Sequence, residues 1–317
     1  MKIFITGIAG MIGFHLSNLL SNEKYEIRGI DSFNDYYDVN LKNARVKILE
    51  KKKINVIRGD LNSTTEKDWA DFLKNVDVVI HLAAYTNPRH SLDFQQLYID
   101  HNITGTNNLI KELEKNNINK VIYASSSCVM HGQELPWKEN DSPKHQNNPY
   151  GWSKRVNECQ FKHSKINQTI GLRFFTVYGP YGRPDMALYS FTKNIIEEKK
   201  INLYNYGNMQ RDFTYVEDIV SGINLVINKI FNDSITYDEI FNIGSGKKIN
   251  LIDFVSEIEK NLGRKANTIL APHHPADTGV TWADITKIKE LGYKPKTSVK
   301  IGIEKFVNWY KDYYKVN

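Results

Sequence analysis

The chain has 317 residues, 41% of them hydrophobic and 25% charged, and its formal net charge is +6. This balance excludes a disordered chain and allows one or two domains with ordinary cores. The apolar runs are too short to cross a bilayer, and with only two cysteines we expect neither a disulfide framework nor a metal site. The densest basic run, 51–53, is typical of a solvated loop, so neither a nucleic acid nor a membrane is an expected partner. The N-terminal residues fit a strand and turn better than a signal peptide, which favours a cytoplasmic protein.

Short apolar strands alternate with helical patterns through the first half of the chain. The predicted strands cover residues 2–6, 26–31, 54–58, 76–81, 120–125 and 169–174, and the predicted helices cover 11–21, 41–50, 66–74, 103–116 and 149–165. This alternation predicts an α/β fold with a Rossmann-type, doubly wound parallel sheet that helices cover on both faces. Such sheets bind ligands beyond the carboxyl ends of their strands.

After Phe175 the rhythm becomes irregular. Helices are predicted over 187–199, 216–231, 251–262 and 299–313, and strands over 201–204 and 240–243. The pattern indicates a smaller mixed α/β domain that binds the substrate. We expect a larger dinucleotide-binding domain of residues 1–174 plus 213–243 and a smaller one of residues 175–212 plus 244–317, with the ligand site between them.

Three glycines, Gly7, Gly10 and Gly13, separate the first strand from the first helix. Without Cβ atoms, they let the chain turn tightly, approach a pyrophosphate and pack helix on strand. The helix N-terminus then offers oriented N–H groups to the phosphates. The same spacing also suits a simple turn.

An acidic residue at the end of the second strand strengthens the dinucleotide interpretation. Asp31 lies 18 residues after Gly13, near the distance expected for a carboxylate that binds the ribose hydroxyls. Because this carboxylate would repel a 2′-phosphate, we expect NAD rather than NADP. Asp60, which precedes Leu61 after the third strand, is placed either to meet the adenine edge or to serve as a turn carboxylate.

Tyr150 and Lys154 share one face of a predicted helix because they are four residues apart. A nearby ammonium and a positive nicotinamide ring would lower the pKa of the phenol, so that Tyr150 could take a proton while hydride leaves the same carbon. Three serines, 125–127, end the fifth strand at the edge that faces the cofactor. They could hydrogen-bond the reacting oxygen or simply form a polar strand exit.

With these motifs in this order, the chain resembles the extended short-chain dehydrogenase/reductase superfamily along its whole length, and within it the UDP-glucuronate 4-epimerases most of all. The most telling stretches are GLRFFTVYGP at 171–180, GRPDMAL at 182–188 and RDFTY at 211–215. Further matching stretches are 29–31 with 34–39, 81–84, 204–207 and 291–295.

The resemblance implies roles for individual residues. Tyr150 is the implied catalytic base, Lys154 its partner and ribose contact, and Ser126 the bridge to the sugar hydroxyl. The NAD site would comprise Gly7, Gly10, Met11, Ile12, Gly13, Asp31, Asp60, Leu61, Leu82, Ala83, Ala84, Asn102, Tyr150 and Lys154. The UDP-sugar site would comprise Ser126, Ser127, Thr176, Arg183, Arg211, Asp277 and Arg89. The family also implies a homodimer formed through helices 103–116 and 149–165.

Within the sugar site, Arg211 would bind the diphosphate and Asp277 would lie near the uridine ribose. An arginine suits a diphosphate because its planar fork donates two hydrogen bonds at once. Thr176 replaces an Asn that is typical of galactose-type epimerases, and with Ser126, Ser127 and Arg183 it would hold the sugar carboxylate. Arg183 could instead form a salt bridge with Asp185.

Two segments depart from the family pattern: 129–132 reads VMHG instead of containing Val-Tyr-Gly, and 85–89 reads YTNPR as a predicted loop. We interpret His131 as a structural substitute. Sugar 4,6-dehydratases carry Asp-Glu after the catalytic hydroxyl, and UDP-glucuronate decarboxylases carry Glu at the second position, where this chain has Ser127 and Cys128. The sequence therefore predicts 4-epimerisation of a UDP-sugar, with UDP-glucuronate as the expected substrate. Alternatives are a 4-epimerase of UDP-glucose or UDP-N-acetylglucosamine type, a UDP-glucuronate decarboxylase, and an NAD-binding regulator without activity.

Overall fold

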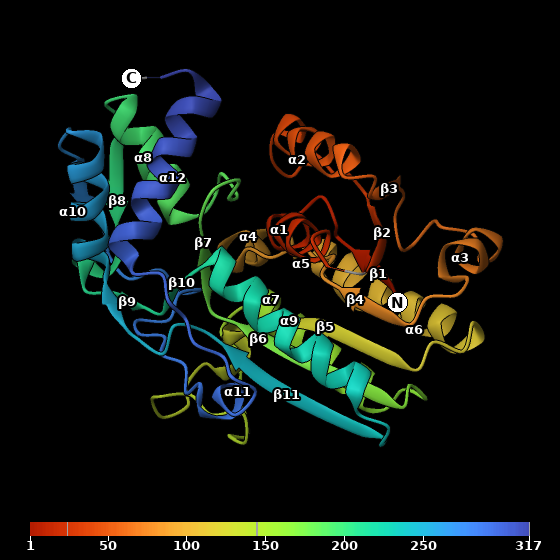
Figure 1. The fold of residues 1–317 in the computed structure, drawn as a ribbon. Helices are drawn as coiled ribbons and strands as arrows, with labels where there is room; N and C mark the ends of the chain where they lie inside the picture. The colour runs from red at the N-terminus through yellow and green to blue at the C-terminus, as the bar shows by residue number, and fades with distance from the viewer. Residues whose placement is uncertain (24, 144, 317) are drawn as a thin grey trace.

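A parallel sheet of seven strands forms the centre of the molecule (Figure 1). The computed structural model describes residues 1–23, 25–143 and 145–316. The strand order is β3-β2-β1-β4-β5-β6-β11. These strands are β1 (Lys2–Thr6), β2 (Glu26–Asp31), β3 (Asn55–Arg58), β4 (Val78–His81), β5 (Lys120–Ser126), β6 (Gln168–Phe174) and β11 (Tyr237–Ile243). The order reverses between β1 and β4, where a doubly wound sheet opens a crevice for ligands.

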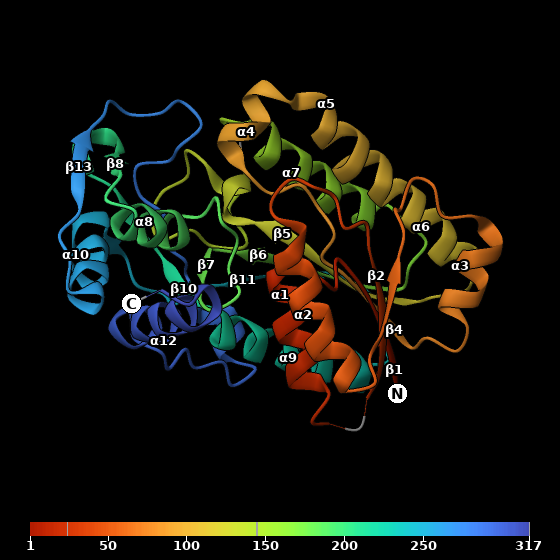
Figure 2. The same cartoon turned by 90° about the horizontal axis from the view of Figure 1, so that it is seen from above.

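Helices cover both faces of the sheet (Figure 2). Along β1, Ile3 and Ile5 pack into the core on one face, whereas Phe4 packs into the core on the other, because side chains alternate along a strand. The face with Ile3 and Ile5 is covered by α1 (Met11–Leu20), α2 (Val39–Lys51), α9 (Val216–Asn232) and the short α11 (Thr286–Lys289). The face with Phe4 is covered by α3 (Glu66–Leu73), α6 (Gly105–Lys115) and α7 (Pro149–Lys162). The predicted doubly wound α/β fold is confirmed.

A second core lies beyond the end of β6. Its buried side chains come mainly from α8 (Ala187–Ile196), α10 (Leu251–Leu262) and α12 (Val299–Tyr314). Three strand pairs belong to the same region: β7 (Thr176–Tyr178) with β10 (Phe213–Tyr215), β8 (Lys200–Leu203) with β13 (Asn267–Leu270), and β9 (Gln210–Arg211) with β12 (Ile249–Asn250). The rings of Phe213 and Phe254 stack at its centre, 3.9 Å apart. The domain boundaries proposed from the sequence stay a prediction.

The predicted elements agree with the structure except at several ends and in one loop. The six strands predicted in the first half end within two residues of the observed bounds. The helix predicted over 187–199 ends at Ile196 because Glu198 adopts a left-handed φ of 56° before β8. The helix predicted over 149–165 ends at Lys162, where the Ser164 hydroxyl donates to the Phe161 carbonyl. A π-helical segment, Ile99–Thr104, precedes α6.

The segment 85–89 is not a loop throughout, because Pro88 begins α4 (Pro88–Asp93), which α5 (Gln95–Tyr98) follows. The Asn87 side chain accepts hydrogen bonds from the N–H groups of Arg89 and His90, at 2.9 and 3.1 Å. An Asn cap followed by Pro is a start signal that the sequence contains. None of the helices in the described part of the chain is long and apolar enough to cross a membrane.

Candidate active site

The turn between β1 and α1 is built so that only glycine fits two of its positions. Gly7 has φ +72°, and a Cβ at Gly13 would lie 2.4 Å from the Gly7 carbonyl oxygen and 2.8 Å from the Ile8 Cα. Gly10 precedes α1, its N–H donates to the Gly7 carbonyl at 2.9 Å, and it gives the helix no side-chain cap. The first turn of α1 contains no acidic side chain. Its N–H groups are therefore suited to bind an anion.

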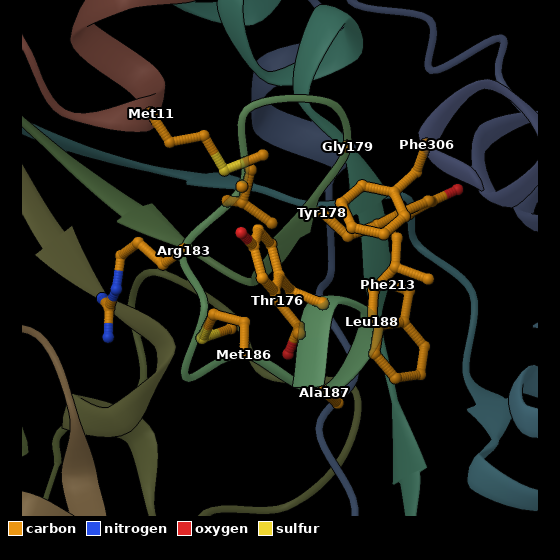
Figure 3. A pocket seen from close by; sticks show the side chains of 13 residues that line it. Met11, Thr176, Tyr178, Gly179, Arg183, Met186, Ala187, Leu188, Phe213 and Phe306 are labelled. Carbon is orange, nitrogen blue, oxygen red and sulfur yellow. The ribbon is translucent and has the colours of Figure 1, made fainter. Parts of the chain in front are cut away.

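Met11 and Ile12 open α1 directly after these glycines. Ile12 packs against the main core, whereas Met11 reaches toward the second core. Figure 3 shows the Met11 side chain at the edge of a small apolar cavity. Helix α1 thus connects the glycine turn to the region that follows β7.

Asp31 is buried at the carboxyl end of β2 and faces the glycine turn. Its carboxylate accepts hydrogen bonds from the N–H groups of Ala9 and Phe33, at 3.2 and 2.9 Å. The Lys42 ammonium lies 3.4 Å away. The carboxylate is therefore held in one orientation, beside a cation that offsets its charge.

Asp60 forms the turn expected in the alternative interpretation of this residue. Its carboxylate accepts the N–H of Asn62 at 2.8 Å and lies 3.7 Å from the imidazole of His101. Leu61 packs partly buried against the core of the second sheet face. A contact of Asp60 with the adenine and of Leu61 with the cofactor stays a prediction.

The segment that follows β4 lies against the glycine turn. The Ala83 N–H donates to the Thr6 hydroxyl at 3.2 Å, and a Cβ on Gly7 would come within 2.7 Å of the Ala83 nitrogen. Leu82 packs against the main core, and Ala84 is partly buried beside it. The backbone of 82–84 thus borders the same crevice as the glycine turn.

Asn102 is fully buried and uses its amide within the protein. Its oxygen accepts the Tyr85 N–H at 2.8 Å, and its nitrogen donates to the Tyr85 carbonyl and the Ser153 hydroxyl, both at 2.9 Å. These bonds fix the chain after β4 relative to α7. A direct contact of Asn102 with the cofactor stays a prediction.

Ser126, Tyr150 and Lys154 come together where β5 ends and α7 begins. Ser126 ends β5, and its hydroxyl accepts the Cys128 N–H at 3.1 Å. The Lys154 ammonium donates to the carbonyl of Ala124 on the same strand at 2.9 Å. Helix α7 can approach this closely because a Cβ on Gly151 would lie only 2.8 Å from the Cys128 carbonyl oxygen.

The two titratable groups of this cluster are shifted in unexpected directions. Burial raises the pKa of Tyr150 above its ordinary value, and a hydrogen bond with Ser126 opposes the rise. Burial also lowers the pKa of Lys154 to about 7. Burial thus works against the lowering of the Tyr150 pKa that is expected from Lys154 and the nicotinamide ring together, and that lowering stays a prediction.

A buried ion pair beneath this cluster was missed by the sequence interpretation. Glu158, four residues after Lys154 on α7, accepts the Ser125 hydroxyl at 2.6 Å and pairs with Arg173 of β6 at 2.8 Å. Although burial opposes ionisation, Arg173 holds the pKa of Glu158 below its ordinary value. The i, i+4 spacing from Lys154 was the available signal, but the partner on β6 was not visible in it.

Two arginines, Arg89 and Arg211, lie close to Asp277. Arg89, at the start of α4, donates to Asp277 from Nε at 3.2 Å and from Nη2 at 2.7 Å, and lies over the ring of Tyr204 at 3.8 Å. Arg211 donates to the carbonyls of Gln210 and Gly279, both at 3.0 Å. Burial lowers the pKa of Arg211, and the nearby charge of Asp277 opposes that lowering. The guanidinium groups of Arg89 and Arg211 provide the planar hydrogen-bond donors that a diphosphate would need.

Ser127 directly follows Ser126, whereas Thr176 and Arg183 belong to the segment after β6. Ser127 is buried at the start of the turn after β5, and Thr176 begins β7. Thr176 and Arg183 line an apolar cavity of about 20 Å³ together with Met11 and Phe306 (Figure 3). The Arg183 guanidinium points away from the middle of this cavity in the figure.

Arg183 forms the salt bridge with Asp185 that the sequence left open as an alternative. Its Nε donates to Asp185 at 3.0 Å, and its Nη1 donates to the Thr86 carbonyl at 3.3 Å. His131 shares a hydrogen bond of 3.0 Å with the Thr278 hydroxyl, next to Asp277. That contact agrees with a structural role for His131.

Comparisons with known proteins agree with this arrangement. The NAD dependent epimerase/dehydratase family matches residues 3–244. A UDP-glucuronate 4-epimerase of Thermodesulfobacterium geofontis is 35% identical, over 97% of this chain and 95% of that protein. UDP-glucuronate 4-epimerase 4 of Arabidopsis thaliana is 34% identical, over 99% of this chain and 76% of that protein.

A solved structure is similar over the whole chain. The crystal structure of UDP-glucuronic acid 4-epimerase from Bacillus cereus, in complex with UDP-glucuronic acid and NAD, has a TM-score of 0.91 and 33% identity, and the match covers 99% of this chain and 100% of that one. Fold, glycine turn and family match point to one conclusion. The chain belongs to the NAD dependent epimerase/dehydratase family.

Proposed function

We propose that this protein is an NAD-dependent isomerase that converts UDP-glucuronate to UDP-galacturonate by inverting carbon 4 of the sugar. One observation carries the proposal: Ser126, Tyr150 and Lys154 meet at the end of β5. The two residues that follow Ser126 are Ser127 and Cys128, so neither of these positions holds a carboxylate. The similarity to UDP-glucuronate 4-epimerases over nearly the whole chain supports it.

The residues of the glycine turn and its surroundings fit NAD. Gly7 and Gly13 leave room that a Cβ would fill, α1 offers its N-terminus, and Asp31 is an oriented acceptor for ribose hydroxyls. When bound, NAD would supply reversible hydride transfer at carbon 4 of the sugar. Lys154 would contact the nicotinamide ribose, and the backbone of 82–84 would border the cofactor.

Tyr150 is the general base and the general acid in this proposal. It takes the proton of the 4-hydroxyl as the sugar becomes a 4-keto sugar, and gives a proton back after that sugar has turned its other face. Ser126 hydrogen-bonds the same oxygen in both steps. Because burial raises the pKa of Tyr150, the phenolate needs a positive charge beyond that of Lys154. The positive ring of NAD is suited to supply it.

The UDP group would lie under the residues of the second core. Arg211 and Arg89 would bind the diphosphate, and Asp277 would lie near the uridine ribose. Ser126, Ser127, Thr176 and Arg183 would hold the sugar carboxylate. A 4-keto uronic acid is a β-keto acid, so a fixed carboxylate also protects it from loss of CO₂.

Elimination and decarboxylation are less well supported by the same residues. Both reactions in this superfamily use carboxylates after the catalytic hydroxyl. Ser127 and Cys128 cannot replace them at neutral pH, and burial raises the pKa of Cys128 further. A regulator without activity would not need all three catalytic side chains.

The test is incubation with UDP-glucuronate and analysis of the products by NMR. We expect UDP-galacturonate with no net reduction of NAD. UDP-xylose or a persistent keto sugar would contradict the proposal. Conversion of UDP-glucose or UDP-N-acetylglucosamine alone would favour the 4-epimerase of a neutral UDP-hexose instead.

We also infer that two parts of the chain bind different ligands. Residues 1–174 plus 213–243 would bind NAD, and residues 175–212 plus 244–317 would bind the UDP-sugar. Two copies would associate through α6 and α7, where Trp152 is 39% exposed. The two free cysteines, Cys128 and Cys159, agree with a cytoplasmic location.

A further inference from the structure

Asp185, in the chain between β7 and α8, accepts hydrogen bonds from three separate segments. Arg183 donates from Nε at 3.0 Å, Asn87 donates from its amide at 2.8 Å, and Tyr36 donates from its hydroxyl at 3.0 Å. Tyr36 lies after β2 and Asn87 after β4. The Asp185 carboxylate therefore links the segments that follow β2, β4 and β7, at the edge of the sheet where the ligand crevice opens.

These hydrogen bonds use only some of the N–H donors of the Arg183 guanidinium. A guanidinium has five N–H donors. Nε and Nη2 donate to Asp185, and Nη1 donates to the Thr86 carbonyl at 3.3 Å. Two donors remain, one on Nη1 and one on Nη2, without a hydrogen-bond acceptor among the described residues. They can donate hydrogen bonds to a second carboxylate.

The protonation states of this network are settled at neutral pH. Although burial opposes ionisation, Arg183 holds the pKa of Asp185 below its ordinary value. Burial and Asp185 raise the pKa of Tyr36 to about 12, so Tyr36 stays a donor. The charge of Arg183 also opposes the rise in the pKa of Tyr150, which places the guanidinium within electrostatic reach of the reacting end of the site.

We propose that Asp185 is a positioning residue that holds Arg183 for the carboxylate of the sugar, and so makes the site selective for a UDP-uronic acid over a neutral UDP-hexose. This inference rests on the proposed function, because it assigns the recognition of its substrate. Tyr36 and Asn87 act through Asp185 in the same way. An unpaired Arg183 would sample many rotamers, and ordering it would cost affinity on each binding event.

Two other roles of Asp185 would give different binding results. If Asp185 merely occupied Arg183 in place of the substrate, removal of its charge would free the guanidinium and tighten the binding of a uronate. If Asp185 merely held the three loops together, its loss would weaken all UDP ligands to a similar extent.

The experiment compares Asp185→Asn with its parent by calorimetry, both in a Tyr150→Phe protein loaded with NAD, so that binding is measured without turnover. The probes are UDP-glucuronate, UDP-glucose and UDP. We expect the Kd of UDP-glucuronate to rise about tenfold or more, as for the loss of a charge-assisted hydrogen bond, while the Kd of the other two stays within about twofold.

Two further variants test whether Asp185 acts through Arg183. Arg183→Gln should show the same selective loss, and adding Asp185→Asn to it should cost little more, because residues that act as a unit are not additive. Tyr36→Phe should show a smaller loss of the same kind.

An unchanged or lower Kd for UDP-glucuronate in Asp185→Asn would overturn the inference, and so would an equal loss for UDP. Failure of the proposed function is seen separately, as a wild-type protein that does not epimerise UDP-glucuronate. The binding comparison requires no turnover, so it decides the role of Asp185 in either case.

Discussion

The carboxylate of Glu158 accepts a hydrogen bond of 2.6 Å from the hydroxyl of Ser125. Ser125 precedes Ser126 on β5, and Glu158 follows Lys154 by one turn of α7. Arg173 of β6 pairs with the same carboxylate at 2.8 Å. This buried carboxylate thus links the strand that carries Ser126 to the helix that carries Tyr150, in addition to the hydrogen bond from Lys154 to Ala124.

Replacing this carboxylate should destabilise the protein. Glu158→Gln leaves the buried Arg173 guanidinium without its counter-charge, and breaking such a pair costs about 3–5 kcal/mol. Denaturant unfolding at pH 7 measures the loss. Glu66→Gln is the matched control, because Glu66 pairs with Lys115 at the surface and its loss should change little. A loss in Glu158→Gln no larger than in this control would show that the buried pair is unimportant.

Removing the phenol oxygen of Tyr150 should abolish most of the reaction while leaving the site assembled. Tyr150→Phe is expected to lower kcat by about 10²–10⁴-fold, the usual contribution of a positioned acid or base, with NAD binding retained. Tyr123→Phe is the control, because the Tyr123 hydroxyl on β5 is buried without a hydrogen-bond partner among the described residues. Activity in Tyr150→Phe equal to that of the control would remove Tyr150 from the proton transfer.

Lys154 should make the stability of the cofactor-free protein depend on pH. Its pKa is about 7 in the folded protein and about 10.5 when unfolded, so the unfolded chain binds more protons between these values. The free energy of unfolding should therefore rise as pH rises from 7 to 10.

Lys154→Met should lack this contribution and be more stable at pH 7 by up to about 4 kcal/mol, less the hydrogen bond to Ala124. Its activity should nevertheless be lost. Unfolding curves of both proteins at pH 7 and pH 10 give the comparison. Identical pH dependence in the two proteins would contradict the shifted pKa.

A methyl group at Gly13 should prevent cofactor binding. In Gly13→Ala the new Cβ would lie 2.4 Å from the Gly7 carbonyl oxygen, so the turn between β1 and α1 must move. Gly105→Ala is the control, since a Cβ at this first residue of α6 would lie at 3.6 Å or more from its nearest neighbours. Fluorescence titration with NADH should show a loss of at least about tenfold in affinity for Gly13→Ala only. Equal affinities in the two variants would mean that the turn tolerates a side chain.

Local patterns were enough to predict the main features of the fold. The spacing of Gly7, Gly10 and Gly13 after an apolar strand, and the alternation of strands with helices, depend on neighbours close in sequence. The four-residue spacing of Tyr150 and Lys154 likewise predicts their common face, because side chains one helical turn apart lie above one another. The start of α4 was missed although Asn87 and Pro88 signal it, because a short helix has little periodicity to detect.

The sequence by itself determined the parallel sheet, the dinucleotide turn and the helix that carries Tyr150, because each depends on backbone preferences and short-range spacing. Only the tertiary structure decided that Asp185 meets Tyr36 and Asn87, which are 149 and 98 residues away, and that Glu158 meets Arg173. It also decided the direction of the pKa shifts of Tyr150 and Lys154. Burial and long-range pairing arise when distant strands and loops are brought together, and no local pattern contains that information.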